Sequence, residues 1–384
     1  MGFKFLLNNN TKSEIGCFRK LIGEISGKEE SIIFIVDEGF SSTQLFLNTY
    51  KAFEKVVQTK KIVISGKKEP SYSDLNQYLE KAKVFSPDLI IGVGGGSAMD
   101  CAKAISVLLK NTDNPLNYRG FDQITKEGVE LWLVPTNAGT GSEASYNASF
   151  VDNKSKKKMG INGNFMFAKK SFLDAETTLS CPKFSFLGST VDAIVHSIEG
   201  YICKNSNVFS DMFAVKSLQL LISNFEYFFK NSFDNKIETE KDLEIRQQLL
   251  EGAYLAGIVQ MNSGSGIAAA ISYPLSVYHN VPHGIGGGIF LPHVLEFNLK
   301  NQLKKINELS KSLNYTTPEN MVFNIKEMFL INGVPQNLSR FGLYRNNKNH
   351  IVEIMKTQQL AFDQNPILFR VEEEFVSFID NFLE

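Results

Sequence analysis

A short run near residue 90 constrains the fold more than any other part of the chain. Residues 89–93 are apolar in the manner of a buried strand, and Gly94, Gly95 and Gly96 end that strand. Apolar residues then recur at helical spacing over residues 102–109. Glycine lets the backbone approach an anion closely, and a helix start offers free N–H groups. The run therefore predicts a site for a phosphate-bearing ligand, with an ordinary glycine turn as the alternative.

The glycine run departs from the usual dinucleotide fingerprint. Ser97 stands where that fingerprint has its third glycine, and the run follows a later strand rather than the first. Motifs from the rest of the chain are therefore needed to choose between a phosphate site and a plain turn.

Strand-like and helical patterns alternate through the first half of the chain. The strand-like runs cover residues 31–36, 61–65, 89–93 and 131–134, and helical patterns cover residues 45–53 and 75–82. This alternation predicts a doubly wound parallel sheet with helices on both faces. Later patterns, at residues 191–202, 211–229, 243–261 and 302–313, are helical. We therefore expect an α/β dinucleotide-binding domain over residues 1–184 and an all-α domain over residues 185–384.

Composition excludes several classes of partner. The net charge of −1 over 384 residues gives no electrostatic reason to expect binding to nucleic acid or to a membrane surface. The start lacks the apolar core of a secretion signal, and no apolar run reaches the ~18 residues of a membrane span. Cys17, Cys101, Cys181 and Cys203 are widely spaced and form no CxxC pair. We expect reduced thiols in a cytoplasmic protein.

Two further segments of the first half favour a dinucleotide. Asp37 ends the strand at residues 31–36, where a carboxylate can accept hydrogen bonds from a ribose and repel a 2′-phosphate, which favours NAD over NADP. Residues 135–143 follow another strand and are rich in glycine and hydroxyl groups, as in a loop that wraps a pyrophosphate. A turn aspartate and a plain surface loop are the alternatives. Two glycine-rich strand ends in one sheet favour a shared ligand.

The second half carries candidate metal ligands. Asp192 and His196 lie four residues apart in a helical segment, so both side chains project from one face. Three of the five histidines, His279, His283 and His293, fall within fifteen residues. A helix cap or a core hydrogen bond is the alternative for the Asp192 and His196 pair, but the concentration of histidines favours a metal site.

Taken together, these motifs resemble the iron-containing (group III) alcohol dehydrogenase family over nearly the whole chain. The matching pieces are Gly94-Gly95-Gly96-Ser97 with Asp100 and Lys103, residues 135–143, Asp192 with His196, Pro282-His283-Gly284 and Leu291-Pro292-His293. The resemblance implies a fold like that of dehydroquinate synthase, with nicotinamide and metal meeting in a cleft. It also implies a homodimer or larger homo-oligomer.

The resemblance also assigns roles to individual residues. Those that it places at the cofactor are Gly94, Gly95, Gly96, Ser97, Asp100, Thr136, Thr140 and Ser142, with Asn147 and Lys158 nearby. Asp192, His196 and His283 match three of the family's four ligands for a divalent metal, Fe²⁺ or Zn²⁺. The cofactor is expected to be NAD(H) rather than NADP(H).

The chain departs from the family at two positions in the second half. Ala269 stands where the family places its fourth ligand, and Tyr273 stands where a second histidine near the nicotinamide is common. One hypothesis is a weakened metal site, with His279 as a substitute ligand. The competing hypothesis is metal-free reduction in which Tyr273 donates the proton, since a phenol with a pKa of ~10 is protonated at neutral pH. The third interpretation is that Tyr273 only fills space.

The sequence thus predicts an NAD(H)-dependent oxidoreductase that interconverts a small alcohol and its aldehyde, in the reducing direction. Tyr273 and His283 are its candidate catalytic residues. Residues 272–275 weakly resemble the phosphonoacetaldehyde reductase branch, which gives one alternative specificity. Two competing hypotheses are a lyase of the sugar-phosphate cyclase type and a non-catalytic nucleotide-binding descendant.

Overall fold

The computed structural model describes residues 2–7, 10–66, 69–229 and 239–384. The chain forms two compact units. The sheet unit comprises Leu7–Ser185 and Glu238–Gly257, and the helical unit comprises Met1–Leu6, Phe186–Ile237 and Ile258–Glu384. The predicted two-domain division between residues 184 and 185 stays a prediction, since each unit groups segments that are not continuous in sequence.

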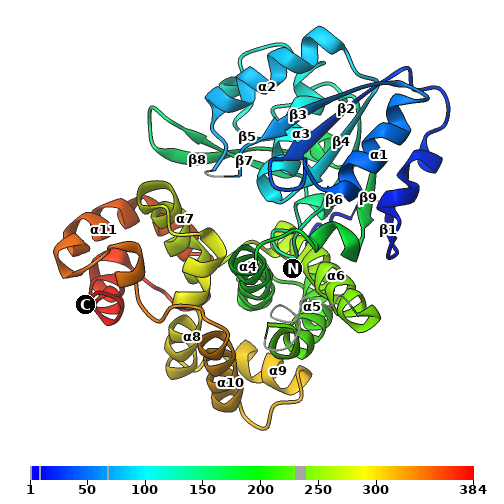
Figure 1. Cartoon of the computed structure of the whole chain (residues 1–384). Coiled ribbons are helices and arrows are strands. Elements are labelled where there is room, and N and C mark those ends of the chain that lie inside the picture. The colour runs from blue at the N-terminus through cyan, green and yellow to red at the C-terminus, as the bar shows by residue number, and fades with distance from the viewer. Residues whose placement is uncertain (1, 8–9, 67–68, 230–238) are drawn as a thin grey trace. The chain divides into compact units, whose positions relative to one another are not determined.

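The sheet unit is built on six parallel strands in the order β1-β9-β6-β4-β2-β3 (Figure 1). The bounds are β1 Asn10–Ser13, β2 Ser31–Asp37, β3 Gln58–Ile64, β4 Leu89–Gly94, β6 Glu130–Pro135 and β9 Lys170–Leu173. β2 lies between β3 and β4, with Ile35 opposite both Ile62 and Gly92. The predicted parallel sheet is confirmed.

Helices cover both faces of this sheet, so the predicted doubly wound arrangement is also confirmed. Alternate residues of β2 divide between two cores, as strand geometry requires. Ile33 and Ile35 pack with α2 (Tyr72–Phe85) and α3 (Gly96–Leu108). Phe34 packs on the opposite face, where its ring meets the Phe46 and Phe53 rings of α1 (Gln44–Glu54).

A small second sheet, which the sequence did not predict, has the order β5-β8-β7. Its strands are β5 Gly120–Phe121, β7 Asn147–Asp152 and β8 Lys157–Asn162, and β7 pairs with β8 in antiparallel register. These strands are short and partly polar, so each has too few apolar residues to stand out as a strand in the sequence.

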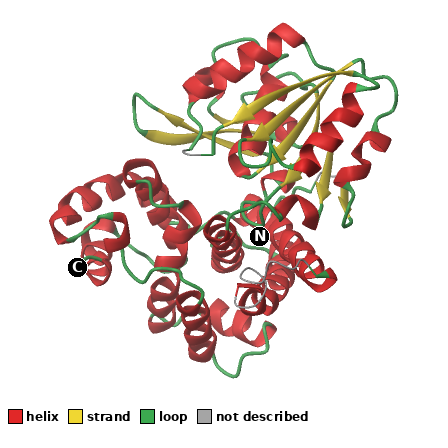
Figure 2. Cartoon of the chain, in the orientation of Figure 1, coloured by secondary structure: helices red, strands yellow, loops and turns green. Residues whose placement is uncertain are grey.

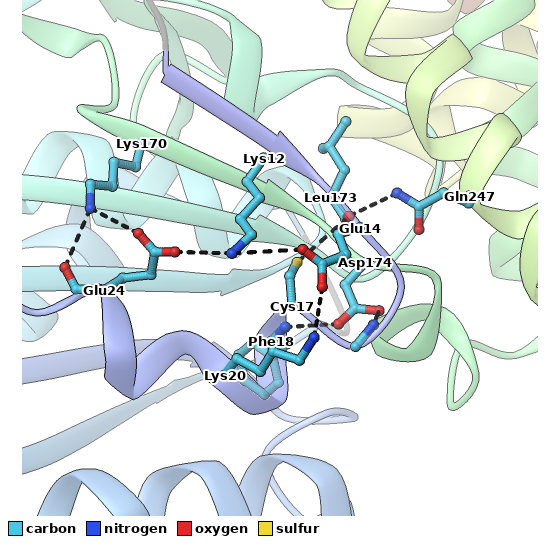
Figure 3. Close-up of polar contacts among 11 residues, drawn as sticks. Lys12, Glu14, Cys17, Phe18, Lys20, Glu24, Lys170, Leu173, Asp174 and Gln247 are labelled. Carbon is cyan, nitrogen blue, oxygen red and sulfur yellow. Dashed lines mark hydrogen bonds and ion pairs between the residues drawn. The ribbon is translucent and has the colours of Figure 1, made fainter.

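Within the sheet unit, the segment Glu238–Gly257 makes polar contacts with residues near β1 and β9 (Figure 3). Its Gln247 amide donates to the Leu173 carbonyl oxygen at 2.8 Å. In the same region Asp174 accepts hydrogen bonds from the backbone N–H groups of Gly16 and Phe18, at 2.9 and 2.8 Å. These bonds hold the segment after β1, and helix α6 (Glu240–Ser263), against the carboxyl end of β9.

The helical unit contains no strand among its described residues, which confirms the predicted all-α character (Figure 2). Its longer helices are α4 Lys183–Ile202, α5 Val208–Tyr227, α7 Ile267–His279, α8 His283–Lys300, α9 Lys304–Ser312 and α10 Pro318–Ile331. The shorter ones are α11 Lys348–Met355, α12 Gln359–Phe362 and α13 Val376–Phe378. Across the described residues, every helix falls short of the length or apolarity that a membrane span requires.

Candidate cofactor pocket and metal centre

The glycine run forms a tight turn from β4 into α3. Gly94 has φ of +156°, and a Cβ at that position would lie 2.7 Å from the Ala98 Cβ and 2.9 Å from Asp37 Oδ2. Gly95 is the N-cap of α3 and has no side chain to satisfy the first N–H groups. The Ala98 N–H donates to the Gly95 carbonyl oxygen at 3.1 Å, so the N–H groups of Gly96 and Ser97 are the ones that can receive an anion.

A pocket of about 390 Å³ lies at this turn, at the carboxyl ends of β2, β4 and β6. Its lining includes five of the predicted cofactor residues, which are Asp37, Gly95, Gly96, Ser97 and Thr136. In an open parallel sheet, this is the edge at which ligands bind. The structure thus brings the ends of three strands, distant in sequence, around one cavity.

Asp37 is held rigidly in the wall of this pocket. Its Oδ1 accepts a hydrogen bond from the Phe40 backbone N–H at 2.7 Å, and its Oδ2 accepts one from Thr136 Oγ1 at 3.0 Å. Two fixed donors hold this carboxylate in place at the pocket wall.

Asp100 and Ser142 hold a loop rather than line the pocket. Ser142 Oγ donates to Asp100 Oδ1 at 2.5 Å, and the Ser149 backbone N–H donates to Asp100 Oδ2 at 2.8 Å. Thr140 accepts from the Ser142 backbone N–H at 3.2 Å, and its side chain would be 2.9 Å from a Cβ on Gly96. These contacts tie residues 140–149 to helix α3.

Lys103 completes this attachment, and its role was not predicted from the residue itself. Its ammonium is fully buried, donates to the carbonyl oxygens of Ser142 and Asn147, and lies 3.3 Å from Asp100 Oδ1. Burial lowers the pKa of Lys103, and the charge of Asp100 opposes that shift. A lysine within the apolar pattern of residues 101–108 was the signal that sequence reasoning could have used.

Asn147 and Lys158 lie in the small sheet and do not line the pocket. The Lys158 ammonium is 3.0 Å from Glu69 Oε2. Asn147 Oδ1 is buried and has no hydrogen-bond partner among the described residues. Their roles at a cofactor stay predictions.

The helical unit brings the three predicted metal ligands together. Asp192 and His196 are one turn apart on α4, and His283 is the first residue of α8. Asp192 Oδ1 lies 3.6 Å from His196 Nε2 and 3.5 Å from His283 Nε2. The ligand atoms of all three lie within 4.8 Å of one another.

This group fits a divalent cation. Asp192 and His196 are buried, and His196 Nδ1 has no hydrogen-bond partner among the described residues. Two imidazoles and one carboxylate at this spacing form the donor set of open catalytic sites for Zn²⁺ or Fe²⁺. The structure therefore supplies three ligands and leaves further coordination positions to other groups.

Tyr273 lies at the metal group, whereas His279 does not. The Tyr273 ring is 4.4 Å from the His283 ring between centroids. His279, at the end of α7, packs 5.5 Å from the His350 ring instead, and it is absent from the ligand group found among the described residues. The suggestion that His279 substitutes for a ligand gains no support from this geometry.

Glu199 is a further buried acid that sequence reasoning missed. Its carboxylate accepts hydrogen bonds from the backbone N–H groups of Gly266, Ala268 and Ala269, at 2.9, 2.6 and 3.1 Å. Burial raises the pKa of Glu199 to about 7, against the lowering effect of these hydrogen bonds. Glu199 follows His196 by three residues on α4, so it joins the start of α7 to the helix that carries two metal ligands.

Comparison with known proteins identifies the family. The profile of iron-containing alcohol dehydrogenases matches residues 8–175, and the profile of their C-terminal region matches residues 186–377. The chain is 34% identical over 251 residues to 4-hydroxybutyrate dehydrogenase of Clostridium kluyveri, a match spanning 65% of each chain. It is 26% identical over 368 residues to alcohol dehydrogenase 4 of Saccharomyces cerevisiae, spanning 93% of each.

Solved structures agree with this assignment at the level of the fold. Sulfoacetaldehyde reductase from Bifidobacterium kashiwanohense, solved in complex with NAD+, superposes with a TM-score of 0.87 at 21% identity, covering 100% of this chain and 99% of that one. The family and the general class of oxidoreductase predicted from the sequence are therefore confirmed. The chain belongs to the iron-containing alcohol dehydrogenase family.

Proposed function

We propose that this protein is an NAD(H)-dependent oxidoreductase that reduces a small aldehyde to its alcohol. The observation that carries the proposal is the pair of preformed sites. One is a pocket at a bare helix N-terminus, and the other is a buried group of two histidines and one aspartate. Family membership joins the two into one activity.

The pocket accounts for the choice of cofactor. The first N–H groups of α3 can receive a pyrophosphate, and the Asp37 carboxylate can accept hydrogen bonds from ribose hydroxyls. Because Asp37 is fixed by Phe40 and Thr136, it cannot turn away from an added 2′-phosphate. We therefore propose NADH rather than NADPH, in line with the relative that was solved with NAD+.

Asp192, His196 and His283 would hold the metal. When bound, a divalent cation would supply Lewis-acid polarisation of the aldehyde oxygen. The protein itself keeps the ligand atoms of Asp192 and His196 away from bulk water, and Glu199 fixes the start of α7 beside them. The placement of Tyr273 on His283 supports a second role, in which its phenol donates a proton to the developing alkoxide.

The substrate is proposed to be a short aldehyde with an acidic group at its far end. The relatives named 4-hydroxybutyrate dehydrogenase and sulfoacetaldehyde reductase support this class, since their names specify a carboxylate and a sulfonate. An aldehyde that carries a phosphonate would also belong to this substrate class, in line with the resemblance of residues 272–275 to the phosphonoacetaldehyde reductase branch. A homodimer or larger homo-oligomer and a cytoplasmic location stay predictions, which gel filtration with light scattering and fractionation of the native cells would test.

The experiment follows NADH consumption with a panel of aldehydes. The panel contains propanal and two-to-four-carbon aldehydes that carry a carboxylate, a sulfonate or a phosphonate. Protein stripped with a chelator is compared with protein reloaded with Zn²⁺ or Fe²⁺. We expect turnover that disappears on stripping and returns on reloading. NADH binding without turnover across the whole panel would indicate a non-catalytic descendant, and phosphate release from a sugar phosphate would indicate a lyase.

Full activity without metal would support the metal-free reaction, in which Tyr273 donates the proton. In that case Tyr273→Phe should lower turnover about 100-fold or more, the usual contribution of a positioned acid. If Tyr273→Phe has normal turnover, Tyr273 is not the proton donor.

A further inference from the structure

Among the described His, Cys, Asp and Glu residues, the metal group consists of Asp192, His196 and His283. One side chain beside this group has no role in the site described above. Gln260 lies near the end of α6, in the part of that helix that belongs to the helical unit. Its side-chain amide nitrogen, Nε2, is 3.0 Å from His196 Nε2. This is the same ring nitrogen that faces Asp192 Oδ1 at 3.6 Å.

We propose that Gln260 is the fourth protein ligand of the metal, through its amide oxygen. This inference rests on the proposed metal site and adds to it a residue that takes the place of the missing histidine. Ala269, at the position of that histidine, is buried and carries only a methyl group, so it offers no ligand atom.

The spacing around His196 fits a shared ion. Ligands about 2.1 Å from one cation lie about 3.0–3.4 Å from each other when they subtend 90–109° at it. The Gln260 amide nitrogen lies 3.0 Å from His196 Nε2, within this range. Asp192 Oδ1 lies slightly beyond it, at 3.6 Å from His196 Nε2 and 3.5 Å from His283 Nε2. The amide therefore lies as close to the histidine as a neighbouring ligand would.

The hydrogen bond also prepares His196 for coordination. When the Gln260 amide N–H₂ donates to Nε2, the imidazole proton must be on Nδ1, which leaves the Nε2 lone pair toward the site. This is the tautomer that a metal needs from an Nε2 ligand. A half turn of the amide about its last bond presents Oε1 at the same place, because the two ends of the amide are nearly equal in shape.

The chemistry of the resulting donor set differs from that of three histidines. Two imidazoles, one carboxylate and one amide oxygen form a harder set, since carbonyl oxygen favours harder cations than imidazole does. We expect the site to bind metal with lower affinity than a three-histidine site and to depend on Gln260 for the affinity that it has.

The test measures metal affinity and coordination rather than activity. Co²⁺ is titrated into chelator-stripped protein, with dissociation constants from calorimetry and coordination from the visible absorption spectrum. The variants are Gln260→Leu and Gln260→Met, which remove the oxygen at similar volume, and Gln260→Glu, which keeps an oxygen. Gln248→Leu, an exposed glutamine on the same helix, is the matched control.

We expect Leu and Met at position 260 to weaken Co²⁺ binding at least about 100-fold and to change the spectrum, since even an outer partner contributes about 10–100-fold. Gln260→Glu should retain tight binding, and Gln248→Leu should match the wild type. Unchanged affinity and spectrum in the folded Leu or Met variant would overturn the inference and leave the three-ligand site standing. If the wild-type protein binds no Co²⁺, Zn²⁺ or Fe²⁺, the metal part of the proposed function fails as well.

Discussion

A contact between two glycines gives the sharpest test of how the cofactor pocket is supported. Gly257 on α6 lies against Gly141 in the loop after β6, inside the sheet unit. A Cβ on Gly257 would lie 2.7 Å from the Gly141 Cα and 2.9 Å from its carbonyl carbon, and closer still to the carbonyl oxygen. All three neighbours are backbone atoms, which cannot move away by rotating a side chain.

The substitution Gly257→Ala sets two effects of opposite sign against each other. Alanine in a helix is favoured over glycine by about 1 kcal/mol. Overpacking a closed contact costs about 1–3 kcal/mol, and the upper part of that range applies where backbone must shift. The difference is a net destabilisation of about 1–2 kcal/mol. For a unit of this size, each kcal/mol corresponds to about 2–4 °C in Tm.

The assay combines urea unfolding with NADH binding followed by fluorescence. We expect Gly257→Ala to unfold at lower urea and to bind NADH about tenfold more weakly, a change of about 1.4 kcal/mol, because the loop that carries Thr136 must move. Gly23→Ala is the control, since a Cβ there meets nothing within 4 Å. If Gly257→Ala proves as stable as Gly23→Ala and binds NADH normally, the packing argument is wrong.

Three other changes test the charges around the pocket. Asp37→Asn keeps the side-chain shape but removes the charge, so the ratio of kcat/KM for NADH to that for NADPH should fall at least about tenfold in steady-state assays. Lys103→Met leaves Asp100 without its buried partner and should lower the free energy of unfolding by about 3 kcal/mol, measured in urea. Burial raises the pKa of Glu143 from 4.5 to about 7, so its ionisation destabilises the fold progressively between about pH 4.5 and 7. Glutamine at position 143 cannot ionise, so Glu143→Gln should remove this pH-dependent destabilisation, which amounts to about 3 kcal/mol. The free energy of unfolding in urea should then change less between pH 5 and 8 in the variant than in the wild type.

The parts of the fold that were predicted from sequence are those governed by local pattern. The strand 89–94 and helix 96–108 follow from apolar periodicity, and the turn between them follows from the glycines. The small sheet was missed because a strand such as Lys157–Asn162 has only one buried residue, Ile161, and therefore shows too little apolar pattern to reveal it. Periodicity reports burial, so it is silent where a strand is polar.

Residues that act through distant partners were harder to predict. Lys103 reaches carbonyls about forty residues away, and Glu199 caps a helix that begins about seventy residues later. The Gln260 amide contacts a histidine more than sixty residues before it. Each is a polar residue within a largely apolar helical stretch, and this is the signal available in the sequence. Identifying its partner requires the fold.

The proposed phosphate site is indicated in the sequence by glycines rather than by positively charged residues. Among the described residues that line the pocket there is no lysine or arginine, and the one charged side chain, Asp37, is anionic. Lys103, the buried cation on α3, forms an ion pair with Asp100 and donates hydrogen bonds to carbonyl oxygens of the loop. The described part of the pocket therefore offers a diphosphate the backbone N–H groups at the start of α3, whose positive potential comes from the helix itself. Such a site requires the close backbone approach that Gly95 and Gly96 allow, which is why the glycine run was the first indication of it in the sequence.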